Sequence, residues 1–514
     1  MNRIQMVKVG LLLLVLNMSV PVLILAKVTL PSIFSDHMVL QRGMPVPIWG
    51  WADPGEQITL SIAGQIKTTT ADEDGKWVVK LNPLSDHSQL SLTVKGRNTV
   101  VIEDVLVGEV WLAAGQSNMQ LSVNDVTNAW KEKVTANFPQ IRMFTVSRHP
   151  AVTPQTNCDG QWVICSPKTV GNFSAAAYFF ARELHQNLEE PVGMIHASWG
   201  ATPIETWTSM PRMEGPEFEP VFKPWQEKMR VPYDASLAEQ QYVKALTIWT
   251  NRAEVLKSHG KNVPPPPKLM GDPRLDKNYP ANLFNGMIAP IIGYAIRGAI
   301  WYQGENNAGS DFPQLYSVQL PLLIQDWRKR WDEGDFPFAW VQLPNFQAGK
   351  NQRSDNNWSL VREAMLRTLS ETNTGMAITI DVGDPKNIHP KNKQAVGHRL
   401  ALWALAKVYG KNLPYSGPLP AGQTVEGNKM ILSFVHTDGG LVVHGAELKG
   451  FVIAGADHQW VKAIAEIQGD HVIVSSPEVQ LPLAVRYGWA SNPDCNLFNG
   501  AGLPASPFRT DDWK

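Results

Sequence analysis

The chain has 514 residues, 44% of them hydrophobic and 18% charged, which is ordinary globular composition and enough for about three domains. A formal net charge of −1, with no long run of either sign, gives no indication of a nucleic-acid groove or of binding to an anionic membrane. The three cysteines exclude a disulfide framework and follow neither metal nor redox spacing. Cys158 and Cys165 are close enough in sequence to form one bridge in an oxidising compartment, and we expect that bridge.

Residues 1–26 are predicted to be a secretory signal peptide. Arg3 and Lys8 precede two apolar stretches, the second of which ends in Ala26, as is typical of such leaders. A membrane anchor needs about 20 uninterrupted apolar residues, whereas polar residues and a proline interrupt this segment. We therefore expect cleavage near Ala26, a secreted or periplasmic protein, and no membrane insertion after cleavage.

Two regions show the short alternating apolar runs and frequent turn residues that are typical of β-sandwiches. The first spans residues 27–104 and the second spans residues 413–514. The first region has no catalytic constellation of its own, so we interpret it as a scaffold that packs against the core or presents substrate.

Between these regions, β-like runs alternate with helical stretches, which predicts βαβ units and a parallel sheet. This α/β core covers residues 105–231 and 280–412, and residues 232–279, which combine a helical part at 238–257 with a proline run, are predicted to be a surface insertion or lid. The expected strands are 107–113, 192–197, 298–302, 338–341 and 376–380. The expected helices are 173–188, 314–331, 358–369 and 391–409.

Four short motifs, each just past a predicted strand, contain the candidate catalytic residues. They are Gly-Gln-Ser117-Asn-Met, Ser-Trp-Gly200, Gln303-Gly-Glu-Asn-Asn307 and Asp384-Pro-Lys-Asn-Ile-His389-Pro. The carboxyl ends of parallel strands share one edge of a sheet, so distant motifs can converge there on one pocket. We predict an esterase site at this edge.

Ser117 is the predicted nucleophile. Gly115 would let the backbone turn sharply after the strand and place the serine hydroxyl at the start of a helix. A Gly-x-Ser sequence is common by chance, and this one lacks the second glycine of the α/β-hydrolase elbow, which argues against that fold.

His389 is the predicted general base, because a serine hydroxyl needs a base to take its proton. It stands apart among twelve histidines because Asp384 precedes it by five residues and Pro390 starts a helix behind it. Asp384 is the predicted acid that orients the imidazole, Asp381 is the second candidate, and Asn387 would supply a hydrogen bond without the charge. An Asp-Pro pair that only marks a turn is the structural alternative.

The tetrahedral intermediate of ester hydrolysis needs hydrogen-bond donors for its negative oxygen. The backbone amides of Ser117 and Gly200 are the predicted donors, with the side-chain amide of Gln303 or Asn307 as a third. Taken singly, each of these residues has a turn or loop role as its alternative.

Taken together, these blocks resemble the SGNH hydrolase superfamily, and more closely the sialate O-acetylesterase family and its acetylxylan-esterase relatives. The resemblance rests on Gly108-Glu-Val-Trp-Leu-Ala-Ala-Gly-Gln-Ser-Asn-Met, Trp199-Gly-Ala-Thr-Pro-Ile-Glu-Thr-Trp, Trp301-Tyr-Gln-Gly-Glu-Asn-Asn-Ala and Asn387-Ile-His-Pro-Lys-Asn-Lys-Gln, and it covers nearly the whole mature chain. It implies an α/β fold with an SGNH-type, flavodoxin-like core: a five-stranded parallel sheet with helices on both faces, flanked by N-terminal and C-terminal β-sandwich-like regions.

The same resemblance implies that Ser117 is the nucleophile, His389 the base and Gly200 an oxyanion contributor, with no metal or organic cofactor. Superfamily members commonly place the aspartate three residues before the histidine, where this chain has Lys386. Asp384 is therefore an inference about the third member and not a motif match.

The expected function is a secreted serine carbohydrate O-acetylesterase that removes acetyl groups from sialic acid through an acyl-enzyme. Acetylated xylan or another plant polysaccharide is the alternative substrate, and a non-catalytic glycan-binding protein is the alternative of another class. A metal-dependent hydrolase is disfavoured because its ligand spacing does not occur in the sequence. The expected partner is an acetylated carbohydrate and not a nucleic acid.

Several other side chains are candidates for the substrate pocket. Trp199, Trp301 and Tyr302 are candidate substrate contacts, with core packing as the alternative for each. An arginine in the pocket, such as Arg297 or Arg142, would favour the carboxylate of sialic acid. Two acidic residues inside the motifs, Glu205 and Glu305, are expected to hydrogen-bond loop backbone near the site.

Overall fold

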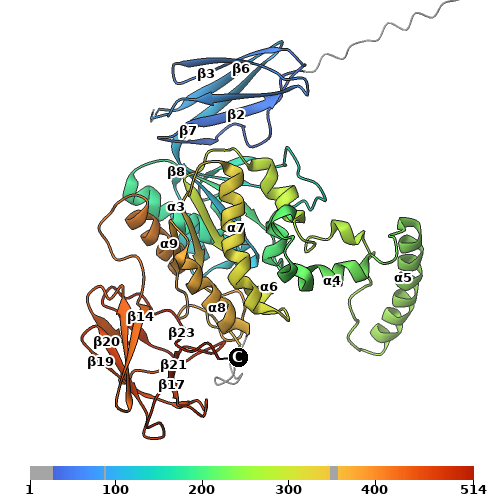
Figure 1. Cartoon of the computed structure of the whole chain (residues 1–514). Helices are drawn as coiled ribbons and strands as arrows, with labels where there is room; N and C mark the ends of the chain where they lie inside the picture. The colour runs from blue at the N-terminus through green and yellow to red at the C-terminus, as the bar shows by residue number, and fades with distance from the viewer. Residues whose placement is uncertain (1–26, 86–87, 348–356, 514) are drawn as a thin grey trace, which may run out of the picture.

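The computed structural model describes residues 27–85, 88–347 and 357–513, and the predicted signal peptide lies outside these residues. Three parts follow one another in space (Figure 1): an N-terminal β-domain, a central α/β core and a C-terminal β region. The protein is a mixed α/β protein with a large mixed sheet and additional small antiparallel sheets.

The N-terminal β-domain consists of strands whose side chains alternate between the core and the surface. One sheet pairs β2 with β5, and in the other β3 lies between β4 and β6, which in turn pairs with β7. The bounds are β1 Val39–Gln41, β2 Val46–Trp51, β3 Gln57–Ile62, β4 Gln65–Thr70, β5 Lys76–Leu81, β6 Leu90–Lys95 and β7 Thr99–Gly115. The alternating runs of this region thus form strands.

β7 belongs to both the N-terminal domain and the core. Its first part pairs antiparallel with β6, and its last part lies between two parallel core strands, β10 and β11. The predicted boundary after residue 104 falls inside this strand, at Asp104, where a φ of 56° interrupts the extended backbone. The two parts of the molecule therefore share one strand, with a local irregularity at Asp104.

The core sheet has the strand order β13-β12-β11-β7-β10-β8-β9, and all neighbours are parallel except β8 and β9. The bounds are β8 Phe138–Thr145, β9 Trp162–Cys165, β10 Val192–Ser198, β11 Gly298–Tyr302, β12 Phe338–Val341 and β13 Thr374–Ala377. The predicted five-stranded, all-parallel sheet is corrected to seven strands, with β8 and β9 added. Proline and arginine interrupt the apolar run of β8, and β9 is a four-residue edge strand, so neither gives a strong periodic signal.

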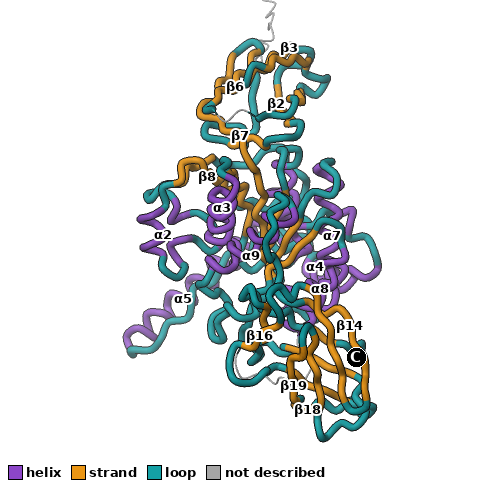
Figure 2. The backbone as a smooth tube through the Cα atoms, turned by 90° about the vertical axis from the view of Figure 1, so that its left-hand side faces the viewer, coloured by secondary structure: helices purple, strands orange, loops and turns teal. Residues whose placement is uncertain are grey.

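Helices cover both faces of this sheet, as predicted (Figure 2). α3 and α9 pack together on one face, and α7 and α8 on the other, each pair around its own hydrophobic cluster. Their bounds lie within two residues of the predicted ones: α3 Ala175–Leu188, α7 Tyr316–Trp331, α8 Asn357–Arg367 and α9 Lys393–Lys407. Shorter helices are α1 Ser117–Gln120, α2 Ala129–Thr135, α4 Glu219–Lys228 and α6 Glu305–Ala308.

The expected bridge between Cys158 and Cys165 does not form, because the structure has both as free thiols. Cys158 packs into the hydrophobic cluster on one face of the core sheet, and Cys165 packs into the cluster on the other face. Burial raises the pKa of each thiol to about 12. The two side chains are thus separated by the sheet.

The segment 232–279 contains the long helix α5 (Ala235–Ser258), close to the predicted helix at 238–257. α5 begins after Asp234, whose side chain accepts the Leu237 N–H. It stands away from the core in Figure 1, and Ala238 and Ala253 are its only buried residues. Across the described residues, no helix has both the length and the apolarity needed to cross a bilayer.

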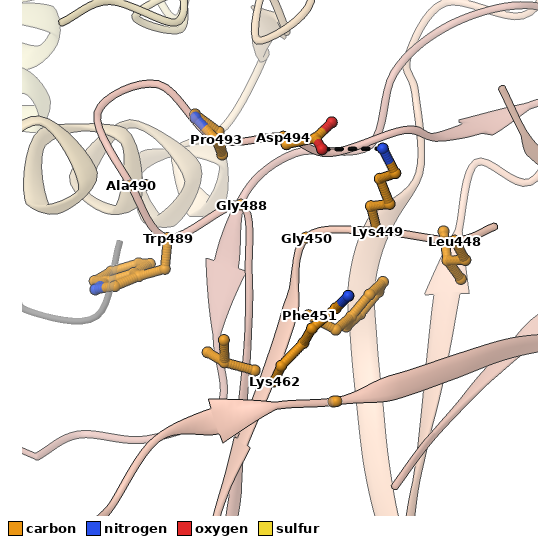
Figure 3. A pocket seen from close by; sticks show the side chains of 12 residues that line it. Leu448, Lys449, Gly450, Phe451, Lys462, Gly488, Trp489, Ala490, Pro493 and Asp494 are labelled. Carbon is orange, nitrogen blue, oxygen red and sulfur yellow. Dashed lines mark hydrogen bonds and ion pairs between the residues drawn. The ribbon is translucent and has the colours of Figure 1, made fainter. Parts of the chain in front are cut away.

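The C-terminal region contains short antiparallel sheets. Their orders are β14-β15-β20-β19, β18-β17-β21-β23 and β16-β22. The bounds are β14 Leu419–Glu426, β15 Lys429–Val435, β16 Leu441–Val443, β17 Phe451–Ala454, β18 Val461–Lys462, β19 Ile464–Gln468, β20 His471–Ser475, β21 Ala484–Tyr487, β22 Leu497–Asn499 and β23 Phe508–Arg509. A hollow of about 430 Å³ lies here, edged by the ion pair of Lys449 and Asp494 (Figure 3).

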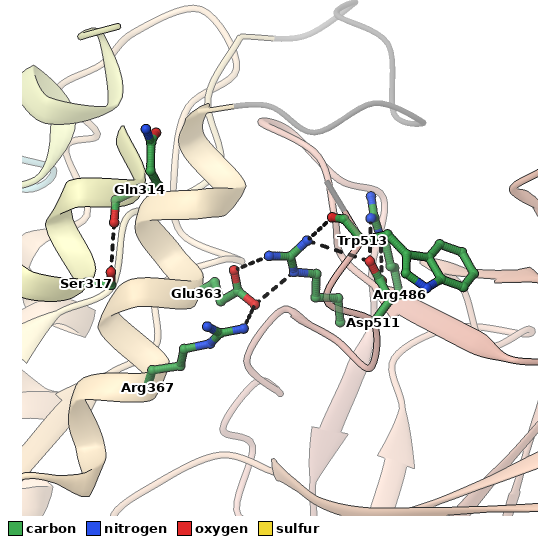
Figure 4. Close-up of polar contacts among 8 residues, drawn as sticks. Gln314, Ser317, Glu363, Arg367, Arg486, Asp511 and Trp513 are labelled. Atoms are coloured by element: carbon green, nitrogen blue, oxygen red, sulfur yellow. Dashed lines mark hydrogen bonds and ion pairs between the residues drawn. The ribbon is translucent and has the colours of Figure 1, made fainter. Parts of the chain in front are cut away.

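The end of the chain attaches the C-terminal region to α8 (Figure 4). Arg509 donates two hydrogen bonds to Glu363 of α8, at 2.8 and 3.0 Å, and Arg486 pairs in the same way with Asp511, at 2.8 and 2.7 Å. Beside them the buried Arg362 donates to the carbonyl oxygens of Leu343, Pro344, Ala490 and Ser491. Two-pronged contacts between arginine and carboxylate are geometrically specific, so Arg509 and Arg362 together fix the C-terminal region against α8.

The turn after β7 has no room for a side chain. Gly115 has a φ of 143°, and a Cβ there would lie 2.1 Å from the carbonyl oxygen of Tyr302 on β11. Because L residues rarely adopt such a φ and the obstacle is backbone, only glycine fits this position.

Gly115→Ala is therefore expected to give little soluble folded protein, or a fall in Tm of more than about 5 °C in a thermal melt. Gly271→Ala is the control, because no atom lies within 4 Å of its added Cβ, and its Tm should equal that of the wild type. An unchanged Tm for Gly115→Ala would contradict the turn geometry.

Candidate active site

Ser117 opens α1 at the carboxyl end of β7. Gln116, in the turn before it, donates its N–H to the carbonyl oxygen of Tyr302 at 3.0 Å, which ties the turn to the neighbouring strand. The N–H of Ser117 lies in the first turn of α1, where a helix offers no internal acceptor. The structure thus presents both the hydroxyl and the amide of Ser117 at the sheet edge.

His389 lies in the loop between β13 and α9, and its Nε2 is 2.8 Å from the Ser117 Oγ. The two residues are 272 positions apart in sequence. Their contact is the nucleophile–base geometry that serine catalysis requires, and the catalytic roles themselves stay predictions. Asn387 accepts the backbone N–H of His389 at 2.9 Å, so it orders the loop and not the ring.

The acids predicted to orient His389 are engaged elsewhere. Asp384 accepts the Lys386 N–H at 2.9 Å, which is the turn role weighed as its alternative. Asp381 binds Arg399 through both oxygens, at 2.6 and 2.7 Å. Within the described part of the chain, no carboxylate contacts the Nδ1 of His389. The structure does not bring Asp384 to His389.

The environment of His389 favours its neutral form. The half-buried ring is partly desolvated, and the nearby ammonium of Lys393 repels a second positive charge. Burial first, and this charge second, lower the pKa of His389 below its ordinary value. The imidazole is therefore ready to accept a proton at lower pH than a free histidine.

Gly200 lies beside the nucleophile, as predicted for an oxyanion donor. A Cβ at Gly200 would lie 3.2 Å from the Cβ of Ser117. Its N–H donates to the side-chain oxygen of Gln120 at 2.8 Å. A substrate oxyanion at this amide would take the place of the Gln120 oxygen.

The prediction of Gln303 or Asn307 as a third oxyanion donor is corrected by the structure. The amide group of Gln303 donates to Gln116, to the carbonyl oxygen of Thr202 and to Asn307, at 3.1, 3.1 and 2.7 Å. That of Asn307 donates to Glu205 at 3.0 Å and Gln319 at 3.3 Å. Both side chains are buried and their donors are used internally, so they support the loops behind the site.

The predicted aromatic substrate contacts divide into two kinds. Trp301 and Tyr302 are fully buried, because β11 is an inner strand with helices on both faces, and their assignment to the substrate is corrected to core packing. Trp199 is partly exposed beside Gly200, and the ammonium of Lys277 lies 5.6 Å from the centre of its ring. Of these three residues, only Trp199 has an exposed surface that a sugar could contact.

The two acidic residues inside the motifs each accept a backbone N–H, their own, and also bind side-chain amides. Glu205 accepts from Asn307 and Gln319, at 3.0 and 3.1 Å. Glu305 accepts from Asn118, the residue after the nucleophile. Burial raises the pKa of both carboxyls. These contacts join the motifs to one another beneath the site.

The cationic side chains at the site are not the predicted arginines. Arg297 precedes β11 at the opposite edge of the sheet and pairs with Glu109 at 2.8 Å, while the buried Arg142 binds Asp104. Instead, Lys277 donates to the carbonyl oxygen of Gly200 at 2.5 Å and Arg148 donates to that of Ser198 at 3.3 Å. Neither lies in a recognised motif, which is why sequence patterns missed them.

A surface hollow of about 380 Å³ opens next to His389. Its lining residues are polar or partly exposed for the most part: Leu121, Asn124, Asp125, Val126, Asn387 and Lys391. The larger hollow of the C-terminal region includes neither Ser117 nor His389. Among the residues that the structure describes, no group of three or more histidine, cysteine or acidic side chains is placed to hold a metal ion.

Comparisons with known proteins found similar chains along nearly the whole length. The carbohydrate esterase family described as sialic acid-specific acetylesterase matches residues 278–406. Sialate O-acetylesterase of Rattus norvegicus is 30% identical and the alignment covers 93% of each chain, and that of Homo sapiens is 29% identical, covering 93% of this chain and 91% of its own. The crystal structure of a carbohydrate acetylesterase from Xanthomonas citri is 36% identical, with a TM-score of 0.80 over 95% of this chain and all of that one.

Ser117→Ala and His389→Ala should each lower kcat on 4-nitrophenyl acetate by about a thousand-fold or more, since each removes one partner of the nucleophile–base contact. Asp384→Asn is the matched comparison, because its oxygen can still accept the Lys386 N–H. We expect its kcat to stay within about threefold of the wild-type value. Loss of an acid that orients the histidine would lower kcat far more than that. A loss for Asp384→Asn equal to that for His389→Ala would restore it as the acid.

The pH dependence of kcat/KM should follow from the lowered pKa of His389. Protonated His389 cannot accept the serine proton, so activity falls as pH drops through the folded-state pKa. Because that pKa is lowered, the midpoint of the acidic limb is expected below the ordinary value of 6.5. A midpoint above 6.5 would mean that an acid contacts the ring in solution.

Proposed function

The chain belongs to the sialic acid-specific acetylesterase family of carbohydrate esterases, and we propose that within this family it removes O-acetyl groups from sialic acid. It is a carbohydrate esterase, and its substrate class is an acetylated carbohydrate. The single observation that supports the proposed mechanism best is the 2.8 Å contact between the Ser117 Oγ and the His389 Nε2.

In the proposed mechanism, the Ser117 Oγ attacks the acetyl carbonyl carbon while its proton passes to the Nε2 of His389. The bond from the acetyl carbon to the sugar oxygen then breaks, and the imidazolium returns the proton to that oxygen. Water enters, His389 takes a proton from it, and the hydroxide attacks the acetyl-serine. Acetate leaves and Ser117 regains its proton.

The negative oxygen of each tetrahedral intermediate would be held by the backbone amides of Ser117 and Gly200. Preorganised donors of this kind typically contribute about a hundred- to a thousand-fold each in rate. The 2.8 Å hydrogen bond from Gly200 to Gln120 supports this role, because it shows that the amide can serve an oxygen acceptor beside Ser117.

Sialic acid differs from neutral sugars by its carboxylate, and two cations support it as the substrate. Lys277 contacts the carbonyl oxygen of Gly200, and Arg148 contacts that of Ser198, the last residue of β10 just before the loop that carries the proposed oxyanion amide. The guanidinium of Arg148 has further donors, which suit a carboxylate. We propose that these cations bind the substrate carboxylate beside Trp199.

We also propose that the chain is exported by means of residues 1–26. The basic start, the apolar stretches and the Ala26 site support this.

The substrate should be tested by measuring acetate release from 9-O-acetylated sialic acid and from acetylated xylan, side by side. We expect faster release from the sialic acid. In Lys277→Met the KM for the sialic acid should rise about tenfold, because one charge contact with its carboxylate is lost, and the KM for xylan should not change. If the substitution also disturbs the Gly200 loop, kcat should fall equally for both substrates.

Ser117→Ala is the control that any release depends on the site. Release from xylan alone would replace sialic acid by plant polysaccharide as the substrate. A Lys277→Met variant whose KM is unchanged for both substrates would remove the carboxylate contact from the proposal, and no release from any acetylated sugar would contradict the function itself.

A further inference from the structure

The backbone on both sides of His389 is held by buried side chains. The carbonyl oxygen of Ile388, just before it, accepts from the side-chain amide of Asn118 at 3.0 Å. The carbonyl oxygen of Pro390, just after it, accepts from the ammonium of Lys393 at 2.9 Å. Two fixed carbonyls that flank one residue hold its backbone and so limit the directions that its side chain can take.

Asn118 connects these two contacts and ties them to the nucleophile. Its side-chain oxygen accepts from Lys393 at 2.7 Å, and its amide group also donates to Glu305. Since Asn118 directly follows Ser117, the loop of His389 is bound to the residue next to the nucleophile. The three side chains come from three different motifs, on α1, α6 and α9.

All three side chains are inaccessible to substrate, with Asn118 and Lys393 fully buried and Glu305 4% exposed. The Lys393 ammonium also lies 4.9 Å from the centre of the Tyr302 ring. Burying charged groups is costly unless they are paired and hydrogen-bonded, and packed apolar side chains are often at least as stabilising. Because apolar side chains could fill this space without loss of stability, the buried cluster of Asn118, Glu305 and Lys393 points to a role other than stability.

We propose that Asn118, Glu305 and Lys393 form a positioning network that holds the imidazole of His389 against Ser117 through the backbone. The network orients the ring through main-chain contacts, which is one of the two roles of the acid on Nδ1 in a Ser-His-Asp triad. It does not supply the other role, stabilisation of the imidazolium. This inference rests on the proposed function of Ser117 and His389.

The same network sets the charge that His389 experiences. Ser117 and Lys393 face His389, and Asp125 and Lys391 line the hollow beside it. Lys393 in turn faces Glu305 and the Tyr302 ring. The Lys393 charge opposes protonation of His389, and burial lowers the pKa of Lys393 itself to about 7. Removing this charge should therefore raise the pKa of His389.

The test compares Lys393→Met with the wild type on 4-nitrophenyl acetate, which needs no sugar contacts. We expect kcat to fall by about 30-fold with KM within about twofold, as for loss of an interaction that matters in the transition state. The acidic limb of the pH profile should move to higher pH. Lys407→Met, at the last turn of the same helix, is the matched control and should keep the wild-type kcat and limb.

Glu305 supplies a second arm that stays informative if Lys393→Met fails to fold. Glu305→Gln keeps an oxygen for Asn118 and should retain kcat within about threefold, whereas Glu305→Leu should lose about 30-fold. Far-UV circular dichroism and Tm establish folding for every variant.

The proposed network would be overturned if folded Lys393→Met or folded Glu305→Leu kept the wild-type kcat and the wild-type acidic limb of the pH profile. The proposal would also be overturned if kcat fell only in proportion to Tm and the acidic limb of the pH profile did not move. The three side chains would then have only a structural role. Failure of the proposed function is distinct, because then the wild type itself would release no acetate.

Discussion

A side chain at residue 115 would overlap the carbonyl oxygen of Tyr302, and this steric limit ties the nucleophile to the sheet. β7 and β11 are parallel neighbours with Gly115 opposite Tyr302, so the backbone must turn at that level. Gly304, two residues after Tyr302, also has a φ near 144° and is tightly surrounded. Two adjacent strands thus end in turns that only glycine fits, and α1 and α6 begin directly after them.

The site has an outer and an inner set of residues. Ser117, His389 and the amide of Gly200 are outer, where a substrate can reach them. Beneath them lie buried amides and carboxyls that bind one another: Gln116, Asn118, Glu205, Gln303, Glu305, Asn307 and Gln319. Because every buried donor needs an acceptor, these side chains fix the loops and leave the chemistry to the outer set.

The sequence was sufficient for the strands and motifs whose signal is local, and insufficient for contacts set by packing. The bounds of β11 and β12 agree with the predicted ones, and Ser117 and His389 meet as expected. β8 was missed because a proline and an arginine break its apolar run, and the Asp-Pro sequence at 384 suggested an acid where the structure has a turn. Lys277 reaches Gly200 from a segment without any recognisable motif.

The sharing of β7 between the N-terminal domain and the core limits how the molecule can move. Hinges between domains are usually a few loop residues that absorb a change in φ and ψ, whereas here a hydrogen-bonded strand crosses the boundary. Closing the two parts around a substrate would break that strand's pairing. The shared strand thus makes the N-terminal domain an extension of the core sheet rather than a separately hinged part.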